Sequence, residues 1–168
     1  MKMKVLSIDP SFTATAWSIW ENEKLYDFGV VSSSKDLTTP LRLKYILDNL
    51  RKVIIENEIT QVVIEGMSLG GVSNSSRMLA GLFYGVQLVC LDLNIPCEEI
   101  SPKSVKKIWS GSGNASKVDM ETACPEYLIK VIESSPFKTL NKGRRDLIDS
   151  FAIYKSWVEL YGNLYSKN

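Results

Sequence analysis

The chain has 168 residues, of which 45% are hydrophobic and 23% charged, as is typical of one globular domain rather than a disordered or fibrous chain. The formal charge of +1 excludes a uniformly basic polyelectrolyte. The absence of histidine excludes Ser-His-Asp triads, Cys-His dyads and histidine-ligated zinc, so any catalysis must use carboxylates, lysines, hydroxyl groups or a metal ion held by oxygen atoms. We expect residues 1–168 to form a single domain.

The first half of the chain predicts four strands and a helix. Residues 4–9 follow an alternating pattern of polar and apolar side chains, and the Asp-Pro pair at 9 and 10 marks its end, which indicates a strand that stops at Asp9. Residues 13–20 and 25–33 are rich in β-branched and aromatic residues around a polar turn, as in an antiparallel hairpin. A helix follows, with one apolar stripe over residues 43–54, and residues 61–65 form a short apolar strand.

The second half predicts a fifth strand among helices. Residues 74–93 form a helix that is apolar nearly all round, so we expect it to be buried or to form an interface. A strand follows at 95–100, and helices are expected at 101–109, 115–132 and 144–161. This order predicts an α/β fold with a mixed sheet flanked by helices.

The cysteines and the apolar stretches give expectations about location. Cys90, Cys97 and Cys124 are odd in number and form no C-x-x-C motif, which is typical of reduced thiols in a cytoplasmic protein. The first residues lack the apolar stretch of a secretory signal. The longest apolar stretch, residues 78–93, is too short and too interrupted to span a bilayer, so we expect no membrane contact.

Four acidic residues stand where a metal site would need them. Asp9 and Glu65 end two predicted strands, and the carboxyl ends of parallel neighbours meet at one sheet edge. Asp146 and Asp149 lie three apart on the last helix, so both project from one face. Singly, each has an ordinary explanation as a turn former or a helix-start acid. Together they favour Mg²⁺ or Mn²⁺, and two such ions can activate water and stabilise a leaving oxygen.

Basic residues concentrate in the last part of the chain. Residues 1–100 carry 9 basic and 12 acidic side chains, whereas residues 101–168 carry 11 basic and 7 acidic ones. Two interpretations stay open on charge alone, a solvated surface or a face that contacts phosphates. The candidate DNA contacts are Lys103, Lys106, Lys107, Lys117, Arg144 and Arg145.

Several short motifs occur in an order that resembles the RuvC-type Holliday junction resolvases, which have a ribonuclease H-like fold with a five-stranded mixed sheet. The resemblance covers nearly the whole chain, and the joint spacing of the motifs makes it specific. The motifs are Ile8-Asp9-Pro10-Ser11, Val63-Ile64-Glu65-Gly66, Ser101-Pro102-Lys103-Ser104-Val105-Lys106, the stretch Gly111 to Lys117, and the stretch Asp146 to Ala152.

The resemblance implies a homodimeric, metal-dependent endonuclease of DNA recombination and repair. Such an enzyme nicks two opposed strands of a four-way junction and leaves 5′-phosphate ends, with Mg²⁺ or Mn²⁺ as cofactor, as two ions per site. Asp9, Glu65, Asp146 and Asp149 match the family's metal-binding acids, and Lys106 and Lys117 its DNA-contacting lysines. Residues 74–93 match its dimer helix, so charge at Leu82 or Val86 is expected to disrupt a dimer.

Two departures favour a divergent member, such as a phage-encoded resolvase acting in the host cytoplasm. Ser11 replaces the family's usual glycine, and residues 67–69 lack an aromatic residue that helps to distort the junction in bacterial enzymes. The main alternative is a ribonuclease H-like nuclease for other branched DNA, flaps or RNA–DNA hybrids. A non-catalytic DNA-binding protein and an actin-like nucleotide-binding protein are further alternatives, although the latter fold pairs two domains.

Overall fold

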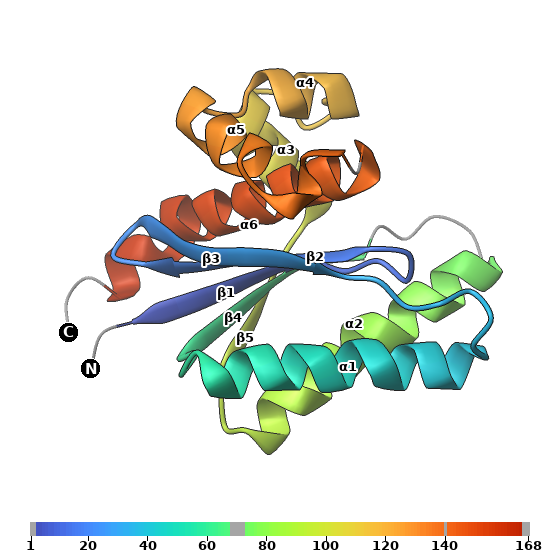
Figure 1. Ribbon diagram of the computed structural model, residues 1–168. Coiled ribbons are helices and arrows are strands. Elements are labelled where there is room, and N and C mark those ends of the chain that lie inside the picture. Colours follow the sequence, from blue (N-terminus) through green and yellow to red (C-terminus); the bar gives the residue numbers. More distant parts are fainter. Residues whose placement is uncertain (1–2, 68–72, 140, 166–168) are drawn as a thin grey trace.

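The computed structural model of the chain describes residues 3–67, 73–139 and 141–165. Five strands form one sheet in the order β3-β2-β1-β4-β5 (Figure 1). β1 runs antiparallel to β2 and parallel to β4, so the sheet is mixed, as predicted. The strands are β1 (Lys4–Asp9), β2 (Thr15–Glu21), β3 (Lys24–Val31), β4 (Gln61–Glu65) and β5 (Cys97–Ile100).

Helices cover both faces of the sheet. α1 and α2 lie against one face, while α6 runs along the other with α3, α4 and α5 stacked beyond it (Figure 1). The helices are α1 (Thr39–Glu56), α2 (Asn74–Asp92), α3 (Pro102–Ser110), α4 (Lys117–Thr122), α5 (Glu126–Glu133) and α6 (Asn141–Tyr165), with a 3₁₀ turn, η1 (Pro136–Thr139), before α6.

The alternation of side chains along the strands divides the core into two layers. On β1, Leu6 and Ile8 are buried against α1 and α2, whereas Val5 belongs to the core beneath α6. On β4, Val62 and Ile64 face α1 and α2, and Val63 faces α6. Successive side chains of a strand point to opposite faces of the sheet. The last residues of β1 and β4, Asp9 and Glu65, are therefore on the same face as Val5 and Val63, toward α6.

Two predicted helix boundaries were wrong. The helix expected over residues 115–132 is two helices, α4 and α5, because Pro125 disfavours helical backbone at the residue before it and instead caps the start of α5. α6 begins at Asn141 rather than Arg144 and extends to Tyr165. Of residues 67–69, which lack the family's aromatic residue, 68 and 69 lie outside the described residues.

α2 is not buried all round. Leu82 and Val86 are 0% and 1% exposed and pack in the core, so charge placed there would disturb the core of the protomer itself, and the choice of these two residues to probe a dimer interface was wrong. The exposed apolar residues of α2 are Tyr84, Leu88 and Leu91, at 59%, 61% and 70%. They are spaced by four and three residues and form one stripe, here called the α2 stripe.

Cys90, Cys97 and Cys124 all carry free thiols, as the cysteine pattern predicted. Among the helices of the described ranges, none combines the length and apolar character needed to cross a bilayer.

Candidate active site

Two of the predicted acids end neighbouring parallel strands. Asp9 is the last residue of β1 and Glu65 the last of β4, and the register pairs Ile8 with Ile64. Both carboxyl groups therefore leave the sheet at the same edge. Glu65 lies on the α6 face with Val63, two residues before it, because the side-chain period of a strand is two.

α6 brings the other two acids to this edge. The helix packs on β1 and β2, and it carries Asp146 and Asp149 three residues apart. One carboxylate oxygen from each of Asp9, Asp146 and Asp149 lies within 4.8 Å of the others, and we call this group the acid trio. Glu65 stands outside the trio but close enough for its charge to raise the pKa of Asp9.

Burial dominates the electrostatics of the site. Asp9 is partly exposed as a residue, but its carboxyl group is buried. Desolvation, followed by the charges of Asp149, Glu65 and Asp146, raises the pKa of Asp9 well above its usual range. Desolvation also raises the pKa of Asp149, and the positive charge of Lys117 offsets only part of this rise. Desolvation and then the Asp149 charge raise the pKa of Glu65 from 4.5 to about 7.

These raised pKa values predict that the metal-free protein loses stability as pH rises. The folded protein binds more protons than the unfolded chain between the unfolded Glu65 pKa of 4.5 and its folded pKa of about 7, so its stability falls across that window. Glu65 alone contributes about 3 kcal/mol to this fall in the free energy of unfolding. The measurement is chemical denaturation in chelator at a series of pH values.

Glu65→Gln is the matched variant for this titration, because it removes the ionisable group and keeps the side-chain shape. We expect it to flatten the pH dependence. Mg²⁺ should stabilise the wild type more at high pH than at low pH, since it neutralises the ionised acids. A metal-free stability that rises between the two pKa values would contradict the electrostatics described above.

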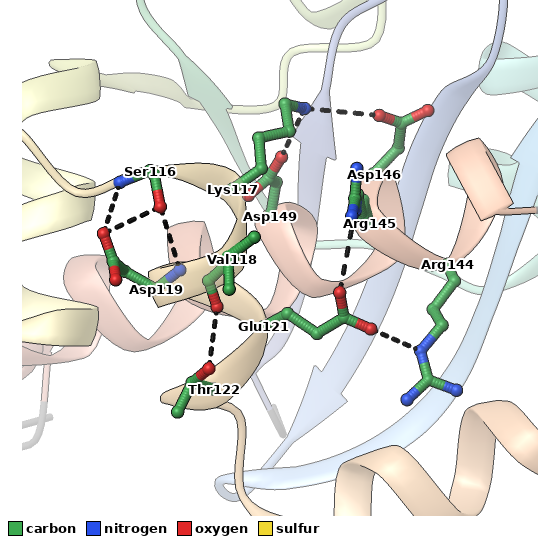
Figure 2. A network of polar contacts seen from close by, with 10 residues as sticks. All are labelled: Ser116, Lys117, Val118, Asp119, Glu121, Thr122, Arg144, Arg145, Asp146 and Asp149. Carbon is green, nitrogen blue, oxygen red and sulfur yellow. Dashed lines mark hydrogen bonds and ion pairs between the residues drawn. The ribbon is translucent and has the colours of Figure 1, made fainter.

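Lys117, the first residue of α4, reaches two members of the acid trio, Asp146 and Asp149 (Figure 2). Its Nζ lies 3.3 Å from Asp149 Oδ2 and 3.9 Å from Asp146 Oδ1. Burial lowers the pKa of Lys117, but the acids around it outweigh burial and raise its pKa overall. The side chain is still 61% exposed, so the ammonium group borders both the acids and solvent. Lys106 on α3 is half-buried, and its charge lowers the pKa of Glu65 and Asp149.

A capping box that we did not predict sets the start of α4. The Ser116 hydroxyl accepts from the Asp119 backbone N–H at 3.2 Å, and Asp119 Oδ2 accepts from the Ser116 backbone N–H at 2.8 Å (Figure 2). An acid three residues after a serine is the sequence signal that could have revealed it. Because the capping box fixes the first turn of α4, it also fixes the position from which the Lys117 side chain extends.

Of the other predicted DNA contacts, the two arginines are paired with Glu121 and the two lysines are exposed. Arg144 Nε contacts Glu121 Oε1 at 2.9 Å, and Arg145 Nε contacts Glu121 Oε2 at 3.6 Å, so Glu121 joins α4 to the start of α6 (Figure 2). Lys103 and Lys107 are exposed on α3. Arg144 is the less available of the two arginines, because its side chain is 23% exposed against 46% for Arg145.

The acid trio fits a divalent cation. Its donors are all carboxylate oxygens, which Mg²⁺ and Mn²⁺ prefer over nitrogen and sulfur ligands. Carboxylates this close and this buried repel one another, and a cation relieves that repulsion. The raised pKa of Asp9 expresses this repulsion in part, since the charges of neighbouring acids add to the effect of burial, whereas burial alone raises the pKa of Asp149.

Comparison with known sequences gives a consistent result. The family model described as "Crossover junction endodeoxyribonuclease RuvC" matches residues 5–136. A crossover junction endodeoxyribonuclease RuvC of Chloroherpeton thalassium is 31% identical over 119 residues, which cover 68% of this chain and 64% of that protein. The corresponding protein of Petrotoga mobilis is 29% identical over 139 residues, or 80% of this chain and 83% of the relative.

Solved structures show the same fold. Thermus thermophilus RuvC aligns with a TM-score of 0.72 at 18% identity over 97% of each chain. T. thermophilus RuvC in complex with a Holliday junction substrate gives 0.71 at 19% identity over 92% of each chain. The yeast mitochondrial Holliday junction resolvase Ydc2 gives 0.66 at 16% identity, covering 98% of this chain and 81% of that one.

Proposed function

The chain belongs to the RuvC family of crossover junction endodeoxyribonucleases, and from this premise we propose that it resolves four-way DNA junctions by metal-dependent hydrolysis in DNA recombination and repair. The observation that carries the proposal is the acid trio, in which three carboxylates from β1 and α6 converge within 4.8 Å beside a lysine. The complex of T. thermophilus RuvC with a Holliday junction supports the same class of substrate.

We assign Asp9, Asp146 and Asp149 to holding the cofactor, with Glu65 completing the site from β4. Mg²⁺, or Mn²⁺ in its place, bound there as two ions would supply a water activated for attack and a positive charge beside the leaving oxygen. The oxygen-only donor set supports the choice of ion. The protein's own part is to hold the acids ionised and close together, which their burial makes unfavourable without a cation.

The reaction is hydrolysis of one phosphodiester in each of two opposed strands. Water attacks phosphorus, the bond between phosphorus and the 3′ oxygen breaks, and that oxygen leaves with a proton. The products are a 5′-phosphate and a 3′-hydroxyl. The phosphodiester is the same in every branched DNA, so the acids alone do not select the four-way junction.

We assign the contacts with the DNA backbone to the lysines around the acids. Lys117 borders both the acid trio and solvent, and Lys106 is close enough for its charge to lower the pKa of Glu65. Both side chains can therefore reach a phosphate held over the acids. Lys103 and Lys107, exposed on α3, extend this basic surface, and Arg145 is the better placed of the two arginines.

We propose that the chain acts as a homodimer formed through the α2 stripe. Tyr84, Leu88 and Leu91 are each more than half exposed, which a second copy of the chain would cover. A two-fold dimer places two acid trios on one assembly, as paired cuts in opposed strands require. The free thiols fit a reducing compartment, and we propose the cytoplasm as the location of this activity.

A synthetic four-way junction with an immobile crossover tests the proposed activity. Each strand is labelled in turn, and products are separated on a denaturing gel with and without Mg²⁺. We expect paired nicks at related positions in two opposed strands, and only with Mg²⁺. Linear duplex, a flap and an RNA–DNA hybrid at the same salt concentration are the comparison substrates, because phosphate contacts make affinity depend on salt. Faster cleavage of the flap or the hybrid would favour the alternative nuclease.

A further inference from the structure

Three buried serines connect α6 to the sheet. Ser7 on β1, Ser18 on β2 and Ser150 on α6 are each 0% exposed, and we call them the serine cluster. Their hydroxyl oxygens are linked in series, since Ser7 Oγ lies 2.7 Å from Ser18 Oγ and Ser150 Oγ lies 3.2 Å from Ser18 Oγ. Elsewhere the core between α6 and the sheet is formed mainly by apolar side chains.

The serine cluster is adjacent to the acid trio on both β1 and α6. Ser7 precedes Asp9 by two residues, so the two side chains share a face of β1. Ser150 follows Asp146 by four residues, so the two side chains share a face of α6. A hydroxyl contact between strand and helix is therefore the polar contact that neighbours the point where the acids meet.

The hydrogen bonds of the cluster are mutually compatible when the Ser150 proton is shared between two acceptors. The Trp20 indole N–H donates to Ser18 Oγ at 2.9 Å, and Ser150 can donate to the same oxygen. Ser18 then donates to Ser7, whose hydroxyl donates to the Ser18 carbonyl at 3.2 Å. This arrangement uses the one proton and both lone pairs of the Ser18 hydroxyl. Ser150 Oγ also lies 2.8 Å from the Leu147 carbonyl, which can share its proton.

We propose that the serine cluster positions α6 against β1 and β2 and so sets the spacing of the acid trio for metal binding. Apolar contacts tolerate small sliding movements between a helix and a sheet, whereas hydrogen bonds weaken steeply outside a narrow range of distance and angle. A buried, fully satisfied network therefore specifies one relative position. The inference rests on the proposed function, because it assumes that Asp9, Asp146 and Asp149 hold the cation.

Ser150→Ala is the first test, because it breaks the link between α6 and Ser18 while Trp20 keeps its acceptor. Mn²⁺ binding is measured directly by the loss of the free-ion electron paramagnetic resonance signal, and junction cleavage is measured over a series of Mg²⁺ concentrations. We expect the dissociation constant for Mn²⁺ and the Mg²⁺ midpoint to rise about tenfold, the lower end of the loss seen when groups that orient metal ligands are removed. Junction affinity without divalent ions should not change.

Ser156→Ala is the matched control. Ser156 is also a 0% exposed serine of α6, and its hydroxyl bonds the Ala152 carbonyl at 2.8 Å, within the helix. Both variants lose a buried hydroxyl bond to their own helix, and Ser150→Ala also loses the bond to Ser18, so we expect its loss of thermal stability to be at least as large as that of Ser156→Ala. Only Ser150→Ala should weaken Mn²⁺ binding. An equal effect in Ser156→Ala, or wild-type Mn²⁺ affinity in Ser150→Ala, would overturn the inference.

Ser18→Ala and the double variant Ser18→Ala/Ser150→Ala complete a double-mutant cycle. Because Ser18 is the partner through which Ser150 acts, the double variant should bind Mn²⁺ no more weakly than Ser18→Ala alone. Fully additive losses would overturn the inference. Failure of the proposed function looks different, since the wild type itself would then neither bind Mn²⁺ at the site nor cleave the junction.

Discussion

Asp146→Asn is expected to abolish junction cleavage while leaving junction binding intact. Asp146 is 3% exposed, and one of its oxygens belongs to the acid trio. The substitution keeps the shape of the side chain but removes one negative charge from the cation site. Losing several kcal/mol of transition-state stabilisation corresponds to a fall in rate of about 10³-fold or more. The measurements are single-turnover cleavage in Mg²⁺ and a gel-shift titration with the same junction.

Asp48→Asn is the matched control for this experiment. Asp48 is an exposed acid of α1, on the opposite side of the sheet, where it pairs with Lys44. We expect this variant to cleave at the wild-type rate. Because Asp146→Asn reduces negative charge beside the basic surface, it should bind the junction as tightly as the wild type or more tightly. Cleavage by Asp146→Asn at the wild-type rate would remove the acid trio from the mechanism.

Leu88→Asp is expected to convert a dimer into monomers. Leu88 is 61% exposed in the middle of the α2 stripe, so the substitution leaves the core of each protomer unchanged. Two-fold symmetry introduces the charge from both copies, and an unpaired charge inside an interface opposes association strongly. We expect the dimer dissociation constant to rise about 10³-fold or more. Sedimentation velocity gives the result, with the wild type at twice the 18.9 kDa of the single chain.

Leu160→Asp provides the control for the dimer experiment. Leu160 is 47% exposed on α6, on the other side of the sheet, and undergoes the same chemical change. It should remain dimeric and make paired cuts, whereas Leu88→Asp should lose the pairing of the two nicks. A wild type that sediments as a monomer would contradict the proposed interface without affecting the assignment of the acids.

Lys117 lies between the acid trio and the surface to which we assign the DNA contacts. The ammonium group already offsets part of the charge on Asp149 and Asp146, yet more than half of the side chain is exposed. The capping box of Ser116 and Asp119 fixes the start of α4, and Glu121 holds α4 to α6 through Arg144 and Arg145. Lys117 is therefore carried by a short helix that is itself anchored beside the acids.

Much of the fold could be predicted from the spacing of polar and apolar residues close together in the sequence. The alternation of residues 4–9, the hairpin and the apolar stripe of α1 depend on neighbours in sequence, and the structure confirms these elements. The break at Pro125 was missed because the apolar positions on either side continue a helical spacing. The exposed face of α2 was also assigned wrongly, since a helix that is apolar all round does not reveal which side the sheet covers.

The order of residues along the chain was enough to identify which acids end strands and which share a helix face, because those relations depend on the fixed periods of strand and helix. Packing between remote elements brought Asp9, Asp146 and Asp149 within 4.8 Å of one another, left Glu65 outside this trio and placed Lys117 beside it. It also brought Ser7, Ser18 and Ser150 together. The reason is that distances between elements are set by the packing of many side chains from remote parts of the chain, which no local period encodes.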